Sequence, residues 1–144
     1  MKRTEESIIV EEEYKAGLTE LWAALTDRDQ MVQWFFPNIL AFEAKEGFST
    51  QFVVENEGRV FTHLWTIMDV IPEKKILYRW RYEAYEGDSM VLFEISGDEN
   101  SCKLCLTHKV LENFNDDIPE FSRESCQDGW NYFLKERLKS FLST

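Results

Sequence analysis

The sequence contains few of the residues that cross-link a chain or interrupt its regular structure. It has three cysteines, three prolines and six glycines among 144 residues. Because an odd number of cysteines cannot form a complete disulfide framework, we expect reduced thiols and a cytoplasmic location. The apolar run Ile8-Ile9-Val10 is far too short for a signal peptide or a membrane span, so we expect no membrane partner.

Positive charge is also scarce. The chain has 16 Lys and Arg residues against 27 Asp and Glu residues, which gives a net charge of −11 and a pI near 4.6. Nucleic acids and anionic membranes are bound through basic surfaces. We therefore expect neither of them as a partner.

Familiar catalytic and metal motifs are missing as well. The patterns HExxH, GxGxxG and GxxxxGK do not occur, and neither of the two histidines accompanies a nucleophile motif. Cys102 and Cys105 have the CxxC spacing of zinc and redox sites, but residues three apart on a strand point to opposite faces. We predict no metal, no cofactor and no recognisable catalytic residue.

Aromatic side chains, in contrast, are abundant, with 11 Phe, 5 Tyr and 5 Trp residues. Many lie in segments that alternate between apolar and polar residues, the pattern of a strand with one buried face. We predict seven antiparallel strands, at residues 7–15, 39–44, 48–54, 60–71, 75–82, 90–96 and 102–110. The glutamates at 11–13 place a carboxylate on the covered face of the first strand, which favours an edge position. Segment 60–71 has bulky residues on both faces and is predicted to be a central strand that packs on both sides for part of its length.

The remaining segments have helical spacing. Thr19 is predicted to cap a short helix, and Asp27 a second one that Pro37 ends. Apolar residues three and four apart predict one long amphipathic helix from Asp117 to Leu142, capped by the side chains of residues 115–117. A long helix with one apolar face needs a broad surface to cover. We therefore predict an α+β fold in which a curved antiparallel sheet grips this helix, as a single domain of residues 1–144.

Several strings, in this order, resemble a known family. They are Ser7-Ile8-Ile9-Val10, Leu21-Trp22-Ala23-Ala24-Leu25-Thr26-Asp27, Trp34-Phe35, Val70-Ile71-Pro72, Leu77-Tyr78-Arg79-Trp80, Leu104-Cys105-Leu106-Thr107-His108 and Asp128-Gly129-Trp130. Together they look like the helix-grip domains related to the activator of the heat-shock protein 90 ATPase, within the START-like superfamily. The resemblance covers nearly the whole chain. The resemblance implies the helix-grip fold. It does not specify the function, because this fold hosts many different functions.

Large inward-facing side chains are predicted to line a cavity beneath the long helix. The predicted lining consists of Trp34, Trp65, Tyr78, Trp80, Tyr82, Phe93, His108, Cys126, Gly129, Trp130 and Phe133. A filled aromatic core is the alternative, because packing is decided in three dimensions. A glycine within a helix costs ~1 kcal/mol relative to Ala, so Gly129 is expected to allow close approach of the helix to the sheet or to leave room for a ligand. His108 is the better of the two histidines for polarising a ligand, and His63 is expected to be half-buried.

The leading hypothesis is a non-enzymatic module that binds a small apolar or amphipathic molecule in this cavity. One alternative is a co-chaperone-like domain whose acidic surface docks on a chaperone, as the resemblance implies. Another is a cyclase- or dehydratase-like enzyme that uses His108 or an inward Glu as acid or base. A monomer and a homodimer are both compatible with the sequence.

Overall fold

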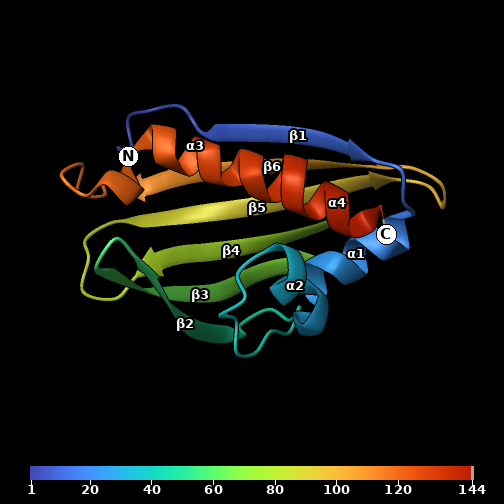
Figure 1. Cartoon of the computed structure of the whole chain (residues 1–144), viewed down its shortest axis with the longest axis horizontal. Helices are drawn as coiled ribbons and strands as arrows, with labels where there is room; N and C mark the ends of the chain where they lie inside the picture. The colour runs from blue at the N-terminus through green and yellow to red at the C-terminus, as the bar shows by residue number, and fades with distance from the viewer. Residues whose placement is uncertain (144) are drawn as a thin grey trace.

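Residues 1–143 are described in a computed structural model, in which one curved sheet of six antiparallel strands carries all helices on one face (Figure 1). The strand order is β1-β6-β5-β4-β3-β2, so β1 and β2 are the edges. The strands are β1 (Ile8–Tyr14), β2 (Ser49–Asn56), β3 (Arg59–Ile71), β4 (Lys75–Tyr82), β5 (Asp88–Gly97) and β6 (Cys102–Glu112). The helical segments are α1 (Leu18–Thr26), α2 (Arg28–Trp34), η1 (Pro119–Phe121), α3 (Arg123–Asn131), η2 (Tyr132–Arg137) and α4 (Leu138–Leu142).

Alternation along the strands sorts their side chains as predicted. Besides Asp88 and Ser89 at the start of β5, the buried residues of the four central strands are Phe61, His63, Trp65, Ile67, Ile76, Tyr78, Trp80, Val91, Phe93, Ile95, Cys102, Leu104, Leu106 and His108. Trp65 stands opposite Trp80, and Trp80 stands opposite Ser89. These three side chains therefore form one row across β3, β4 and β5 on the concave face. The predicted packing of β3 on both sides is wrong, since its other face stays half-exposed at Leu64 and exposed at Met68.

The first strand is an edge strand with a carboxylate on its covered face, as predicted. Glu12 lies beneath the C-terminal helix and forms ion pairs with Lys135 and Lys139 at 3.7 and 3.5 Å. Partial burial raises the pKa of this carboxyl group, but the hydrogen bond from the Glu13 N–H and the two lysines outweigh burial and lower it. The pairing ties the helix to the sheet edge.

Segment 39–44 forms no strand, which corrects the prediction. Its backbone pairs with no neighbouring strand of the described chain, so its apolar residues do not alternate between two faces of a sheet. Instead Ile39 and Phe42 turn inward as anchors of an irregular loop. Backbone hydrogen bonds within the loop are local, and Arg28 Nε donates to the carbonyl of Ile39 at 3.0 Å. The loop that follows α2 is therefore held mainly by side chains.

The C-terminal helix crosses the sheet diagonally in front of β5 and β6 (Figure 1), but it is not one continuous α-helix. It begins at Arg123 and not at Asp117, because the Ser122 hydroxyl caps it by accepting from the Ser125 N–H at 3.1 Å. Asp116, predicted to cap, instead pairs with the N-terminal ammonium group of Met1 at 2.7 Å. Pro119 opens a separate 3₁₀ turn.

Between α3 and α4 the helix widens into the π-helical segment η2. The Tyr14 hydroxyl on β1 donates to the carbonyl of Leu134 in this segment at 2.8 Å. A π-helical turn changes the pairing of its carbonyl groups, and a buried hydroxyl can satisfy one of them. β1 thus fixes the irregular turn in place.

The two short helices fill one end of the concave face (Figure 1). Asp27 caps α2 as predicted, because its carboxylate accepts from the Asp29 N–H at 3.1 Å. The predicted Thr19 cap is wrong, since α1 begins at Leu18 and the Thr19 hydroxyl donates to Glu73. α2 packs against α4 and delivers the chain to the space between helix and sheet.

Candidate functional site

The space between the C-terminal helix and the sheet is centred on Phe35, the first residue after α2. Its ring lies 5.6 Å from Trp65, 5.8 Å from Trp130 and 4.9 Å from Phe133, measured between ring centroids. Trp80 and Phe93 complete the set, at 6.2 and 6.4 Å. We call this cluster, with the neighbouring Phe36, the aromatic interior: Phe35, Phe36, Trp65, Trp80, Phe93, Trp130 and Phe133.

Phe36 fills the adjoining part of the same space. Its ring lies 4.9 Å from His63, 5.2 Å from Phe52 and 5.0 Å from Phe133. The interior was predicted to be partly hollow, yet Phe35 and Phe36 occupy its centre. Three surface hollows, of about 940, 690 and 310 Å³, share no lining residue with the aromatic interior.

Besides Trp34, five of the eleven predicted lining residues contact these two rings: Trp65, Trp80, Phe93, Trp130 and Phe133. Trp130 of the helix contacts Trp80, Phe93 and His108 of the sheet, at 5.5, 5.8 and 6.1 Å. Trp34 is set apart, because its Nε1 donates to the Ala24 carbonyl at 2.8 Å and joins α2 to α1. Its ring stacks on Phe35 at 4.7 Å and supports that residue from behind.

Gly129 is not a point of close approach. A Cβ atom at this position would meet no atom within 4 Å, so contact with the sheet does not explain the glycine. The first of the two predicted reasons is therefore wrong. Room for a ligand beside Gly129 stays a prediction.

A polar cluster adjoins the aromatic interior. Trp130 Nε1 donates to His108 Nδ1 at 3.0 Å, and the Cys126 sulfur lies 3.3 Å from the same nitrogen. Burial lowers the pKa of His108 to about 4 and raises the pKa of the Cys126 thiol to about 12. Near neutral pH this pair is therefore an uncharged thiol beside an uncharged imidazole, and not a thiolate–imidazolium pair.

Two further polar side chains of the concave face, Tyr82 and His63, are also neutral. Trp80 Nε1 donates to the Tyr82 hydroxyl at 3.0 Å, and burial raises the pKa of Tyr82. His63 is buried, where sequence reasoning expected it half-buried, and its ring stacks on Phe52 at 4.8 Å. Burial lowers the pKa of His63 to about 4, against a weaker opposing effect of its hydrogen bond with the Phe61 carbonyl.

Sequence reasoning missed the centre of the site. Phe35 and Phe36 are absent from the predicted cavity lining, and Phe52 lies on the predicted strand 48–54 without a role in the cavity. The available signal was the pair Phe35-Phe36 directly before Pro37, since two adjacent rings at a helix end cannot both lie on the helix face. For His63, the signal was its place in the same alternation as Trp65.

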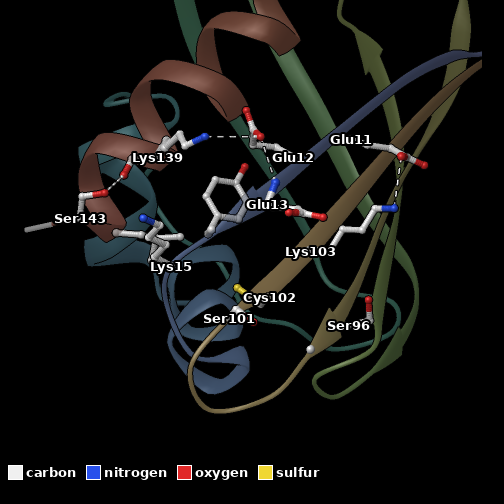
Figure 2. Close-up of a pocket in the computed structure, with 13 residues that line it drawn as sticks. Glu11, Glu12, Glu13, Lys15, Ser96, Ser101, Cys102, Lys103, Lys139 and Ser143 are labelled. Atoms are coloured by element: carbon white, nitrogen blue, oxygen red, sulfur yellow. Dashed lines mark hydrogen bonds and ion pairs between the residues drawn. The ribbon is translucent and has the colours of Figure 1, made fainter.

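A separate hollow of about 940 Å³ lies between β1, the β5–β6 turn and α4 (Figure 2). Figure 2 shows Glu12 pointing toward Lys139 on the helix, while the next side chain, Glu11, points away toward Lys103. The Glu11–Lys103 pair is 3.3 Å long. Because these charges neutralise one another and face water, the hollow lacks the character of an apolar ligand site.

Metal ligands do not gather in the part of the chain that is described. Within residues 1–143, no three His, Cys, Asp or Glu side chains converge as metal ligands would. Cys102 is buried on the concave face and Cys105 lies on the other face of β6, so the two sulfurs point apart as predicted. None of the helices in the same residues is long and apolar enough to cross a membrane.

The sheet, the two short helices after β1 and the C-terminal helix laid across the concave face define a helix-grip α+β protein of the START-like type. The family model described as Activator of Hsp90 ATPase homolog 1-like protein matches residues 15–143. The chain belongs to this family. Among curated proteins, none matches the sequence.

Solved structures share the fold. The protein CV1439 from Chromobacterium violaceum is 18% identical, with 96% of this chain and 98% of that chain covered and a TM-score of 0.78. MLL2253 from Mesorhizobium loti is 22% identical, with coverages of 96% and 97% and a TM-score of 0.70. DynU16, a protein in the dynemicin biosynthetic locus, is 21% identical with a TM-score of 0.76, and the match covers 97% of this chain and 48% of DynU16. This chain thus spans about half the length of DynU16. At these identities the likeness establishes the fold alone.

Proposed function

We propose that this protein is a non-enzymatic module that binds a small apolar or amphipathic molecule in the aromatic interior, where the ligand takes the place of Phe35 and Phe36. The observation that carries the proposal is that two rings from a loop, and not from the sheet or the long helix, fill the centre of the grip. The predicted lining residues of the sheet and helix then form the walls. Aromatic walls suit apolar ligands, since they offer large flat surfaces.

The attachment of the loop supports exchange with a ligand. Residues 36–44 lie outside the sheet ladder, and their backbone hydrogen bonds are mostly local. A segment held by side chains opens at a lower free-energy cost than a paired strand. Withdrawal of Phe35 and Phe36 would expose the rings of Trp65, Trp80 and Phe133 without unzipping the sheet.

The protonation states support binding without chemistry. General acid–base catalysis works best with a group whose pKa lies near the working pH. Burial lowers the pKa of His108 to about 4 and raises that of Cys126 to about 12, far from neutrality on either side. A cyclase- or dehydratase-like reaction that uses His108 as acid or base is therefore not favoured. The three free cysteines accord with the inferred cytoplasmic location.

The test replaces Phe35 with alanine and measures binding of fluorene, a flat hydrocarbon, by calorimetry. Removing the ring frees space for the ligand, so we expect Phe35→Ala to bind fluorene at least ~10-fold more tightly than the unaltered protein, a gain of about 1.4 kcal/mol. The same change should lower the free energy of unfolding by about 3–5 kcal/mol, because it leaves a cavity in the core.

Phe114→Ala is the matched control. Phe114 is also buried, but it packs on Phe121 and Tyr82 away from Phe35. It should lose comparable stability and gain no affinity for fluorene. If fluorene bound neither the unaltered protein nor Phe35→Ala, the proposal would be wrong.

Family membership favours a second candidate, a co-chaperone-like partner of a chaperone. The net charge of −11 would suit a basic docking surface. Stimulation of the ATPase of purified heat-shock protein 90 by this protein would support that role. Native mass spectrometry of protein purified from its own host addresses both candidates, because it reports a retained ligand and whether the protein is a monomer or a homodimer.

A further inference from the structure

Two N–H donors of the concave face have no hydrogen-bond partner among residues 1–143. Trp65 Nε1 and His108 Nε2 are enclosed, and their residues are only 1% and 4% exposed. An N–H group buried without an acceptor costs about 1–3 kcal/mol. Unpaired buried donors are rare in folded proteins, so each requires a reason.

The other interactions of His108 determine that its unpaired nitrogen is a donor. Nδ1 accepts the indole N–H of Trp130 at 3.0 Å and therefore carries no hydrogen itself. A neutral imidazole has one N–H, which must then reside on Nε2. Because burial keeps the ring uncharged near neutral pH, His108 presents a single N–H donor at Nε2.

Trp65 is the exception among the buried tryptophans. Trp34 donates to a backbone carbonyl, Trp80 to the Tyr82 hydroxyl and Trp130 to His108. Around Trp65 the neighbours are rings, with Phe52 at 4.7 Å and Tyr78 at 5.1 Å, both edge to face. Ring faces are weak acceptors compared with an oxygen atom. An oxygen placed beside this indole would therefore gain a hydrogen bond that the protein does not supply.

We propose that Trp65 and His108 are the polar recognition residues of the ligand site, and that the ligand is a flat, uncharged, largely apolar molecule with carbonyl-type oxygen acceptors. This inference rests on the proposed function. Trp80 lies between the two donors in strand order and contacts both rings, at 5.0 and 6.1 Å. It also contacts Phe35 and Phe36, so a ligand that replaced them would lie against Trp80. Oxygen acceptors at the edges of the ligand would then lie toward Trp65 on β3 and His108 on β6.

The cost of burying a charge in the aromatic interior argues for an uncharged ligand. The buried polar residues of the described chain are His63, Asp88, Ser89 and His108, and they include no lysine or arginine. Asp88 is paired with Arg79 and the Ser89 hydroxyl donates to the Trp80 carbonyl, so neither is available. The buried ammonium group of Met1 is already bonded to Asp116 and to the Phe121 carbonyl. A carboxylate moved into this interior would therefore lose its hydration without an unpaired cation to replace it.

The experiment compares three probes that differ in one group: fluorene, fluorenone, which adds a carbonyl oxygen, and a fluorenone carboxylate, which adds a negative charge. Affinities are measured by calorimetry with the unaltered protein. We expect fluorenone to bind at least ~10-fold more tightly than fluorene, and the carboxylate to bind more weakly than fluorenone. The infrared C=O stretch of bound fluorenone should lie at lower frequency than in an alkane solvent, because the oxygen accepts a hydrogen bond.

Two variants assign the donors. Trp65→Phe removes one N–H, and His108→Asn removes Nε2 while its side-chain oxygen can still accept from Trp130. At least one of these changes should abolish most of the preference for fluorenone over fluorene. Trp22→Phe is the control, because Trp22 lies on α1 and has no ring contact with the aromatic interior among residues 1–143, and it should keep the preference.

The outcomes separate this inference from the proposed function. If fluorene and fluorenone bind equally and the carbonyl frequency is that of an alkane solution, the recognition role of Trp65 and His108 is wrong while the apolar site stands. If neither compound binds, both proposals fail. A shifted carbonyl band in the unaltered protein supports the inference even where a variant does not fold.

Discussion

Individual residues of the concave face combine aromatic bulk with neutral polar groups. His63 and His108 are buried imidazoles, and within the described chain neither has a carboxylate partner that would favour its charged form. Each lowers the stability of the native protein in acid, because burial away from water disfavours the protonated imidazole. The effect has a definite sign and can be measured.

Stability should decline as the pH falls from about 6.5 toward 4. Burial lowers the pKa of both histidines from 6.5 to about 4. In that window the unfolded chain binds protons that the native protein does not, so acid favours unfolding, and the loss ends where the native imidazoles also protonate. Each histidine contributes up to about 3 kcal/mol. Urea unfolding at a series of pH values measures the slope.

His63→Phe separates the two contributions. The site is lined by Phe52, Phe36 and Tyr82, so a phenyl ring suits it. Above about pH 5, carboxyl groups are largely ionised in both states, and the slope belongs to the histidines. This variant should lose about half of the slope there. An unchanged slope would show that His63 does not remain neutral in the native protein.

At the scale of elements, the C-terminal helix owes its irregularity to its partner strand. Tyr14 on β1 donates to the Leu134 carbonyl of η2, and Lys135 Nζ donates to the carbonyl of Glu11. π-helical turns inside α-helices are frequently found at functional sites. Here Phe133 lies within the π-helical segment and Trp130 lies just before it, and both are part of the aromatic interior.

Tyr14→Phe tests this connection. Loss of the hydroxyl leaves the Leu134 carbonyl without its buried donor, so we expect the free energy of unfolding to fall by about 1–3 kcal/mol. Denaturant unfolding measures the change. Tyr132→Phe is the matched control, since the Tyr132 side chain is 48% exposed, and it should change stability little. Equal effects of the two changes would contradict a role for Tyr14 in holding the π-helical turn.

At the scale of the whole molecule, the surface carries a large excess of negative charge. A net charge of −11 repels itself in the compact state, and salt screens that repulsion. We expect the melting temperature to rise between an ionic strength of about 0.01 M and about 0.15 M. Differential scanning calorimetry measures the shift.

Glu46→Gln combined with Glu55→Gln is the comparison for this prediction. Both glutamates are exposed and lie on the sheet edge opposite β1 or in the loop before it. Removing two charges should reduce the rise in melting temperature with salt. A fall with salt would show that ion pairs such as Glu120–Arg59, at 2.8 Å, outweigh the net repulsion.

The family resemblance and the inward faces of β4, β5 and β6 were recognisable from the sequence, because alternation on a half-buried strand is a local property. The helix face carrying Trp130 and Phe133 was recognisable for the same reason. The single domain of residues 1–144 stays a prediction. What only the tertiary structure decided is which rings fill the centre. Phe35 and Phe36 reach it from an irregular loop, where no periodicity marks their direction. The missing partners of Trp65 and His108 likewise depend on contacts between residues far apart in the chain, and no spacing within the sequence encodes them.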